Sequence, residues 1–254
     1  MKVLAISDLH GELERLDQLE PMLRKVNPDL VIFAGDVVKG KKRGDEWLAA
    51  QREGREPNRN LPGLKEEIEQ DVKTIEAFLD KFAEWDVPLA YIPGNMDSPK
   101  EHFLFEAVSA ETAHPNVRCV HGGGWVFKNK YAIFGFGGDI SNDRYEDIFQ
   151  FMSPRWEVEY QLKFVNDYDQ PLILVFHIPP TQITKTDPEV DVGPEVVHEM
   201  IKTHRPMLAV VGHVHDQQVR TQIGSSLVVC PGALKKGKYA VIQLPKGDVE
   251  FGSL

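Results

Sequence analysis

The sequence has little cysteine and no long apolar run. Only Cys119 and Cys230 are present among 254 residues, far apart in the chain. This excludes a disulfide-built scaffold and a CxxC metal or redox site, and it fits a reducing compartment. No stretch approaches the roughly 20 apolar residues of a membrane span, and the apolar residues 1–6 are too few for a signal peptide. We therefore expect a soluble, cytoplasmic protein that does not bind membranes.

Positive charge is also scarce. The chain carries 29 Lys and Arg against 39 Asp and Glu, so its formal net charge is −10. This argues against independent nucleic-acid binding through bulk positive charge, although a locally bound cation could still attract a phosphate group. The hydrophobic content of 42% and the length suit one large globular domain. We expect a single domain over residues 1–254, and nothing indicates its oligomeric state.

Short apolar runs alternate with helical patterns along the chain. The early runs are almost continuously apolar, as expected for strands covered on both faces, whereas the late ones follow one another with only turns between. Together they predict an α/β fold with two packed sheets flanked by helices. We expect strands at residues 2–7, 30–34, 89–92, 117–120, 125–127, 132–136, 172–176, 208–211, 218–223, 227–230, 239–244 and 249–251, and helices at 13–26, 65–82, 100–108, 146–164 (split near Pro154) and 195–204.

One segment, at about residues 39–62, has the composition of an insertion. Residues 39–59 hold seven Lys or Arg and four Asp or Glu, with few apolar residues. The simpler interpretation is a solvated loop with a frayed helix. The alternative is a mobile lid over a substrate.

Five polar clusters interrupt the apolar runs, each directly after a predicted strand. In open α/β sheets, ligands bind in the crevice outside the carboxyl ends of the strands. Residues two apart in extended chain face the same side, so paired ligands can reach one region. The clusters are Asp8-Leu9-His10, Gly35-Asp36, Gly94-Asn95-Met96-Asp97, His177 and Gly212-His213-Val214-His215.

The donors in these clusters suit two divalent metal ions. One open metal site takes three or four protein ligands, so seven donors indicate two ions with one carboxylate shared. Nitrogen and oxygen donors without thiolate favour Mn, Fe, Zn, Co or Ni over Mg or Ca. Two neighbouring metals are a known arrangement for displacement at phosphorus. The donors are Asp8, His10, Asp36, Asn95, His177, His213 and His215.

In this order the clusters resemble the signature of the calcineurin-like metallophosphoesterases, which runs DxH, GDxx, GNH(D/E), a lone H and GHxH. The resemblance extends from residue 3 to about 240. Cys230-Pro231-Gly232-Ala233 is similar to the Asn-Pro-Gly-Ser turn of small bacterial and archaeal phosphoesterases of this family. The resemblance implies a four-layer αββα fold, a two-sheet sandwich flanked by helices.

The resemblance also implies roles for the donors. Asp8, His10 and His215 would hold one metal, and Asn95, His177 and His213 the other, with Asp36 bridging. A hydroxide between the metals would attack phosphorus in a small phosphoester substrate. Asp36, Asn95 and His177 count as catalytic in this scheme, and Asp97 would orient its neighbours.

One departure from the family pattern bears on specificity. Met96 occupies the place of the family's GNH histidine near the leaving group, and a thioether cannot donate a proton. This favours substrates with good leaving groups, or another acid such as His121 or His102. The arginine of the phosphoprotein phosphatase branch is also absent, although Lys39, Lys41, Lys42 or Arg43 could supply positive charge.

The expected activity is therefore a binuclear metal-dependent phosphoesterase, with a phosphodiesterase favoured. Three alternatives stay open: a phosphomonoesterase or nucleotidase, a non-catalytic scaffold on the same fold, and a nuclease subunit of a complex. A scaffold has no need of metal ligands, whereas every expected position is occupied here.

Overall fold

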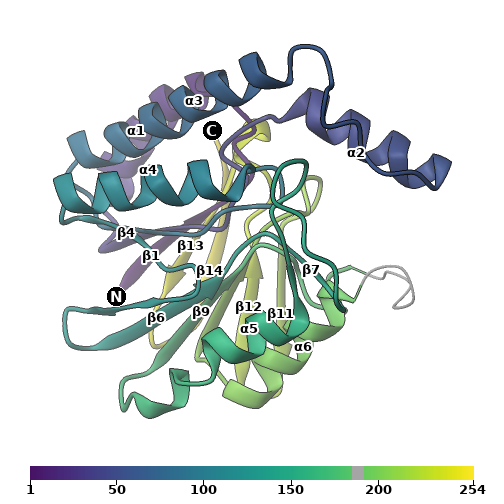
Figure 1. Cartoon of the computed structure of the whole chain (residues 1–254). Helices are drawn as coiled ribbons and strands as arrows, with labels where there is room; N and C mark the ends of the chain where they lie inside the picture. Colours follow the sequence, from purple (N-terminus) through teal and green to yellow (C-terminus); the bar gives the residue numbers. More distant parts are fainter. Residues whose placement is uncertain (185–191) are drawn as a thin grey trace.

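Two six-stranded sheets face each other in the computed structural model, and helices cover the outer side of each (Figure 1). The structure describes residues 1–184 and 192–254. The strand order is β14-β13-β1-β2-β3-β4 in the first sheet and β11-β12-β10-β9-β6-β5 in the second, and β7 pairs with β8 separately. This is the predicted αββα sandwich.

The strands of the first sheet are β1 (Lys2–Ile6), β2 (Leu30–Phe33), β3 (Leu89–Tyr91), β4 (Val117–Cys119), β13 (Lys238–Gln243) and β14 (Asp248–Ser253). Those of the second are β5 (Gly124–Phe127), β6 (Tyr131–Phe136), β9 (Leu172–Phe176), β10 (Leu208–Val211), β11 (Val219–Ile223) and β12 (Ser226–Cys230). The short pair is β7 (Asp139–Ser141) and β8 (Met152–Pro154). The α-helices are α1 (Glu14–Val26), α2 (Lys41–Glu53), α3 (Leu64–Glu84), α4 (Lys100–Ala113), α5 (Arg155–Leu162) and α6 (Gly193–His204).

Strand β1 shows why the strands are continuously apolar. Val3 and Ala5 point into the core between the two sheets, whereas Leu4 and Ile6 point into the core beneath the helices. Both faces are buried, so every position needs an apolar side chain. The first sheet is covered by α1, α3 and α4, and the second by α5 and α6 (Figure 1).

The predicted helix at 146–164 is wrong over its first half. Residues 146–151 form an irregular segment, residues 152–154 form β8, and only Arg155–Leu162 is helical. The Glu146 side chain accepts backbone N–H bonds from Asp147, Ile148 and Phe149 at 3.1, 2.8 and 3.1 Å. This local turn competes with a helix for the same donors. The late strands do form antiparallel hairpins, but β11–β12 and β13–β14 lie in different sheets.

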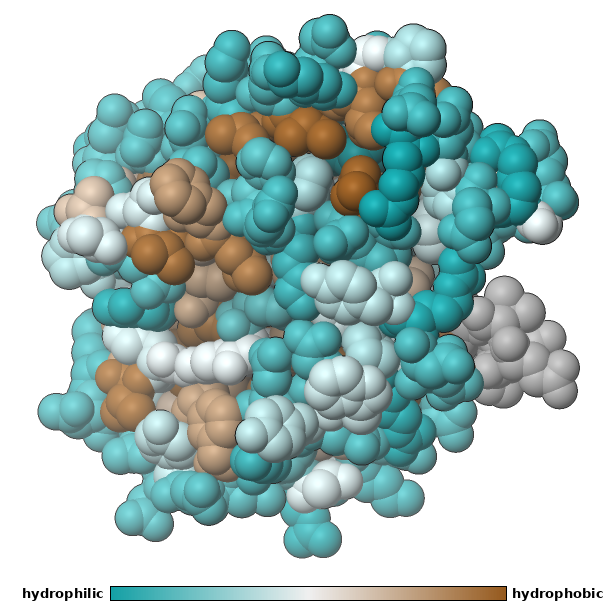
Figure 2. All heavy atoms as spheres, in the orientation of Figure 1, coloured by the Kyte–Doolittle hydropathy of each residue, from teal (hydrophilic) through white to brown (hydrophobic). Residues whose placement is uncertain are grey.

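The charged segment forms the continuous helix α2, so the expected fraying is wrong, whereas residues 54–63 do form a mostly exposed loop. Trp47 is buried in a small apolar cluster with Leu64, Phe149 and Met152. The Glu67 carboxylate accepts the N–H groups of Lys42 and Arg43, at the start of α2. The surface over α2 is mostly hydrophilic, while apolar atoms show over α4, where Phe105 and Val108 are exposed (Figure 2).

A buried arginine joins this segment to the rest of the chain. The Arg43 side chain is 0% exposed, and its Nη2 donates to the Asp71 carboxylate at 2.8 Å and to the Met96 carbonyl at 3.2 Å. Burial raises the pKa of Asp71, although the Arg43 charge opposes this. Arg43 thereby connects α2, α3 and the loop after β3, and it is not free to bind phosphate.

The structure also bears on the two expectations about cysteine chemistry and membrane spans. Cys119 and Cys230 are free thiols, and burial raises the pKa of each to about 12, so neither is a reactive thiolate. Among the helices that the structure describes, none combines the length and the apolar character needed to cross a bilayer.

Arg43→Met should lower the free energy of unfolding by about 3 kcal/mol, because it leaves the buried Asp71 carboxylate without its partner. Urea denaturation measures this loss. Lys41→Met is the control, because it breaks only the exposed pair with Asp45 and should cost less than about 1 kcal/mol. An equal effect of the two variants would show that the Arg43 pair does not hold α2 in place.

Candidate metal centre

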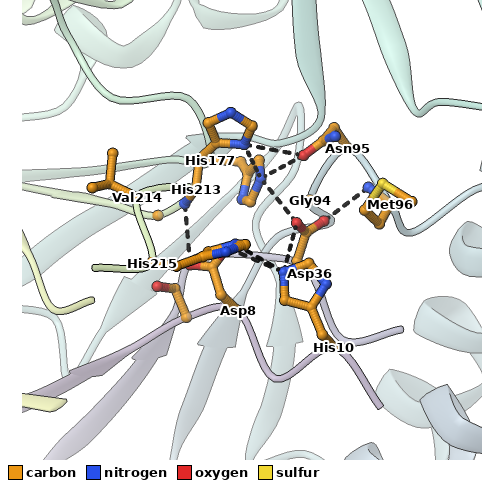
Figure 3. Close-up of polar contacts among 12 residues, drawn as sticks. Asp8, His10, Asp36, Gly94, Asn95, Met96, His177, His213, Val214 and His215 are labelled. Atoms are coloured by element: carbon orange, nitrogen blue, oxygen red, sulfur yellow. Dashed lines mark hydrogen bonds and ion pairs between the residues drawn. The ribbon is translucent and has the colours of Figure 1, made fainter. Parts of the chain in front are cut away.

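Five loops bring polar side chains together at one edge of the sandwich. They follow the carboxyl ends of β1, β2 and β3 in the first sheet and of β9 and β10 in the second. The strands within each group are parallel neighbours, so their carboxyl ends lie at the same edge. All seven predicted donors lie there, and Figure 3 shows them pointing toward one another.

The backbone of these loops adopts unusual conformations. Asp8, His10, Asp36 and His213 have φ values of 58°, 49°, 63° and 67°, in the left-handed region that non-glycine residues seldom adopt. Such conformations persist only where the surroundings enforce them, and they cluster at functional sites. Four of the seven predicted donors are held in this way.

Glycines let two of the loops approach each other closely. A Cβ atom on Gly35 would lie 2.6 Å from the Gly94 nitrogen and 2.7 Å from Nδ1 of His177. A Cβ atom on Gly94 would lie 2.1 Å from Oδ1 of Asp36. These positions therefore accept only glycine, because larger residues would separate Asp36 from Asn95 and His177.

The first group of donors comprises Asp8, His10, Asp36 and His215, whose ligand atoms lie within 4.8 Å of one another. The Nε2 atoms of His10 and His215 are 3.0 Å apart, and Nε2 of His215 is 3.3 Å from Oδ1 of Asp8. Asp8 is 0% exposed, and its Oδ1 accepts no hydrogen bond from the described residues. Its Oδ2 accepts the His213 N–H at 3.1 Å, which fixes the carboxylate in place.

The second group comprises Asp36, His177 and His213, again within 4.8 Å. Nδ1 of His177 donates to the Ala34 carbonyl at 2.8 Å, which leaves Nε2 to face the group. The Asn95 oxygen lies 2.9 Å from Nε2 of His177 and 3.2 Å from Nδ1 of His213. Asn95 therefore joins this group through its carboxamide oxygen.

Asp36 belongs to both groups. Its Oδ1 accepts the Met96 N–H at 2.8 Å, so its Oδ2 is left between the two histidines. Oδ2 lies 3.5 Å from Nε2 of His10 and 3.4 Å from Nε2 of His177. Figure 3 shows Asp36 between the two groups, the position that a shared ligand needs.

The electrostatics of the site call for positive charge. Burial lowers the pKa of His177, but the charge and hydrogen bond of Asp36 outweigh this and raise it to about 10. The pKa of His10 is also raised, because Asp36 and Asp8 together outweigh burial. Two buried carboxylates thus favour protonation of His10 and His177. Burial and the His177 charge instead lower the pKa of His213 to about 4.

These features fit divalent cations. The buried Asp8 Oδ1 accepts no hydrogen bond from the described residues, the nitrogen and oxygen donors include no thiolate, and the carboxylates stabilise added positive charge. The described residues therefore provide what a resident metal needs.

Asp97 fastens two of the ligand loops to each other. Its Oδ2 accepts the N–H groups of Gly94, Asp36 and Val37 at 2.7, 2.9 and 3.1 Å, and its Oδ1 accepts that of Val38 at 2.9 Å. Burial and the Asp36 charge raise the pKa of Asp97 to about 7, while the backbone donors act to lower it. Asp97 orients the loops, as the motif predicts, without joining either group of donors.

The other predicted site residues lie outside both groups. Nδ1 of His121 accepts the Gly137 N–H at 2.9 Å, and burial lowers the pKa of His121 to about 3, so its ring is neutral and a poor acid at pH 7. His102 is exposed on α4 beside Glu101. Lys41 pairs with Asp45, and Lys42 contacts the Gly63 carbonyl, while Lys39 is exposed after the Asp36 loop.

One residue beside the donors was not predicted. Gln150 is 6% exposed, and its Oε1 accepts the Asn95 Nδ2–H at 3.0 Å. It lies in the irregular segment 146–151, where no motif marks it and the predicted helical pattern gives no sign of a buried polar side chain. Only the tertiary contact identifies it.

A family model for metallophosphoesterases of the calcineurin superfamily matches residues 1–254. The chain belongs to this family. One solved structure is 32% identical with a TM-score of 0.88, covering 99% of this chain and 98% of its own. The protein TT1561 of Thermus thermophilus is 27% identical with a TM-score of 0.78, over 99% and 98% of the two chains.

More distant structures share only the fold of this metallophosphoesterase. A dimetal phosphatase from Danio rerio is 10% identical with a TM-score of 0.62, covering 100% of this chain and 95% of its own. A novel archaeal phosphodiesterase is 12% identical with a TM-score of 0.52, over 100% of both chains. No curated protein sequence matches this one.

Asp97→Asn should lower the free energy of unfolding by about 2 kcal/mol. A carboxamide has one oxygen, so its NH2 group must face at least one of the backbone N–H donors that Asp97 now accepts. Thermal and urea unfolding measure the change, with Asp248→Asn on the exposed strand β14 as the control. Unchanged stability would show that these four hydrogen bonds do not hold the two loops together.

Proposed function

We propose that this metallophosphoesterase is a binuclear, metal-dependent hydrolase that favours phosphodiesters. The observation that supports this most directly is the pair of donor groups that share Asp36. Asp8, His10 and His215 would hold the first ion, and Asn95, His177 and His213 the second, with Asp36 a ligand to both. The donor set favours Mn, Fe, Zn, Co or Ni.

Such ions would supply Lewis acidity toward water and toward the phosphoryl group. The chain's own contribution is to fix the donors before substrate arrives. Met96 N–H and Asp97 hold the Asp36 loop, and the Ala34 carbonyl fixes the His177 ring through Nδ1. Rigid donors lose little freedom on binding ions and substrate, which is the general basis of electrostatic catalysis.

The preference for diesters is argued from charge. A monoester dianion needs more compensating charge than a diester monoanion, and an arginine clamp would provide it. Arg43 is committed to Asp71 and Glu67. The chain as a whole carries a formal charge of −10, which repels a dianion more strongly than a monoanion.

The competing functions differ in what they need. A phosphomonoesterase or nucleotidase would use the same donors with a different pocket. A non-catalytic scaffold would not need seven donors converging on one point, so their convergence supports an enzyme. A nuclease role would need a partner to supply basic surface.

The expected setting is the cytoplasm, since both cysteines are unpaired.

The deciding experiment compares two substrates on metal-stripped protein. Bis(p-nitrophenyl) phosphate and p-nitrophenyl phosphate are assayed after adding back Mn, Co, Ni, Zn or Mg singly, with bound metal measured in parallel. We expect about two ions per chain and faster turnover of the diester.

Asp36→Asn should lose both ions and most activity, because both groups depend on this carboxylate. Asp45→Asn on exposed α2 is the control.

Other outcomes separate the alternatives. Faster turnover of the monoester would indicate a phosphatase or nucleotidase. Two bound ions without turnover of either substrate would favour the scaffold. Full metal content in Asp36→Asn would overturn the shared-ligand assignment.

The methionine at position 96 leads to a prediction about how the rate depends on the leaving group of the ester. The general acid that this position lacks is typically worth 10²–10⁴-fold, and only for leaving groups that need a proton. Met96→His should therefore raise the rate on alkyl esters relative to that on aryl esters by at least about 10-fold. Matched series of alkyl and aryl phosphodiesters measure this. Equal, unchanged rates for both series would contradict the assignment of this position.

A further inference from the structure

The side chain of Asn95 has two unlike ends, and only one of them suits a metal ion. The carboxamide oxygen accepts hydrogen bonds, and its lone pairs can also bind a metal ion. The NH2 group can only donate hydrogen bonds. In the structure the oxygen faces His177 and His213, at 2.9 and 3.2 Å. A rotation of 180° about the terminal bond of the side chain would place NH2 there instead. The second group would then lose the oxygen, which is the atom that can bind a metal ion.

The opposite end of the carboxamide identifies what prevents this rotation. Nδ2 of Asn95 donates to Oε1 of Gln150 at 3.0 Å. Gln150 is 6% exposed, so water does not readily replace this acceptor. A flipped Asn95 would set its oxygen against Oε1 of Gln150 and leave its NH2 group facing the imidazoles.

The orientation of Gln150 is fixed in turn by Met96. The other end of the Gln150 carboxamide donates from Nε2 to Sδ of Met96 at 3.7 Å. A thioether accepts weakly and cannot donate, so Met96 can receive Nε2 but cannot compete for Oε1. The residue that departs from the family motif therefore leaves the Gln150 oxygen available to Asn95.

The segment that carries Gln150 is itself anchored beside the site. The Phe151 N–H donates to the Asn95 carbonyl at 2.9 Å, and the Phe151 carbonyl accepts the Asp139 N–H at 2.7 Å. The rings of Phe149 and Phe151, on either side of Gln150, are 0% exposed. Gln150 is thus presented to Asn95 by a buried stretch of chain.

We propose that Gln150 is a positioning residue that holds the Asn95 oxygen toward the second metal position, with Met96 orienting Gln150. This inference rests on the proposed two-metal function. In this role Gln150 acts through Asn95 and is not itself one of the seven donors. Outer partners of metal ligands typically change metal affinity by 10–100-fold, which is the size of effect expected here.

The test is a calorimetric titration of metal-stripped protein with Co²⁺, which reports each binding step without any assay of activity. Gln150→Met keeps the size of the side chain but removes the acceptor. It should weaken the second ion by 10–100-fold and leave the first within about 3-fold. Gln150→Glu keeps an acceptor oxygen and should restore the second ion to within about 3-fold of wild type. Gln150→Leu repeats the measurement if Gln150→Met does not fold.

Two controls give the test its specificity. Gln161→Leu removes a glutamine bonded to Glu157 on α5 and should alter neither ion. Asn95→Asp replaces the carboxamide with two equivalent oxygens, which need no orientation. Adding Gln150→Met to Asn95→Asp should therefore change the second ion by less than about 3-fold, although the same change is costly in the wild type.

Two results would overturn the inference. One is wild-type affinity for the second ion in Gln150→Met. The other is an equal loss of affinity in the Asn95→Asp background, which would indicate a general structural effect. A wild-type protein that binds only one ion would overturn the two-metal proposal and this inference together, and the wild-type titration alone reveals that case.

Discussion

Two carboxylates, Asp8 and Asp36, lie buried where the two sheets meet, and the surrounding structure is arranged to compensate their charge. Four imidazoles and a carboxamide face them. Backbone N–H groups of Met96 and His213 bind one oxygen of each carboxylate and leave the other oxygen directed at the histidines. The left-handed backbone at four of the donors and the close contact of Gly35 with Gly94 follow from bringing these groups so near.

The charge of a third buried carboxylate, Asp97, is compensated by backbone N–H groups. Asp97 binds four backbone N–H groups and so joins the loops after β2 and β3. The neighbouring Met96 carbonyl accepts from Arg43, which ties the same loop to α2 and α3. Residues without a chemical role in hydrolysis thus set the distance between those that have one.

The donors could be predicted from the sequence because their positions are set by topology. Each follows an apolar strand, and parallel neighbours end at one edge of their sheet, so the loops of Asp8, Asp36 and Asn95 lie together, as do those of His177 and His213. The sandwich itself was also predictable, since strands such as β1 are apolar on both faces.

Gln150 and Arg43 could not be predicted, because their environments arise from packing between distant segments. Gln150 lies in a stretch whose helical pattern is overridden by the Glu146 turn. Arg43 is one of several basic residues in a charged segment, and only the fold shows that it is buried. Periodicity reports which face of an element is apolar, and it carries no information about a single polar side chain that the fold encloses.

The donors come from both sheets, with Asp8, His10, Asp36 and Asn95 on one and His177, His213 and His215 on the other. Under the two-metal proposal, each cation therefore joins the two halves of the sandwich, and its binding free energy is also free energy of their association. Folding and metal supply are then linked, since ligands that bind only the native state stabilise it by RT ln(1 + [L]/Kd). For such a protein, the concentration of available metal affects the stability of the folded state as well as the rate of turnover.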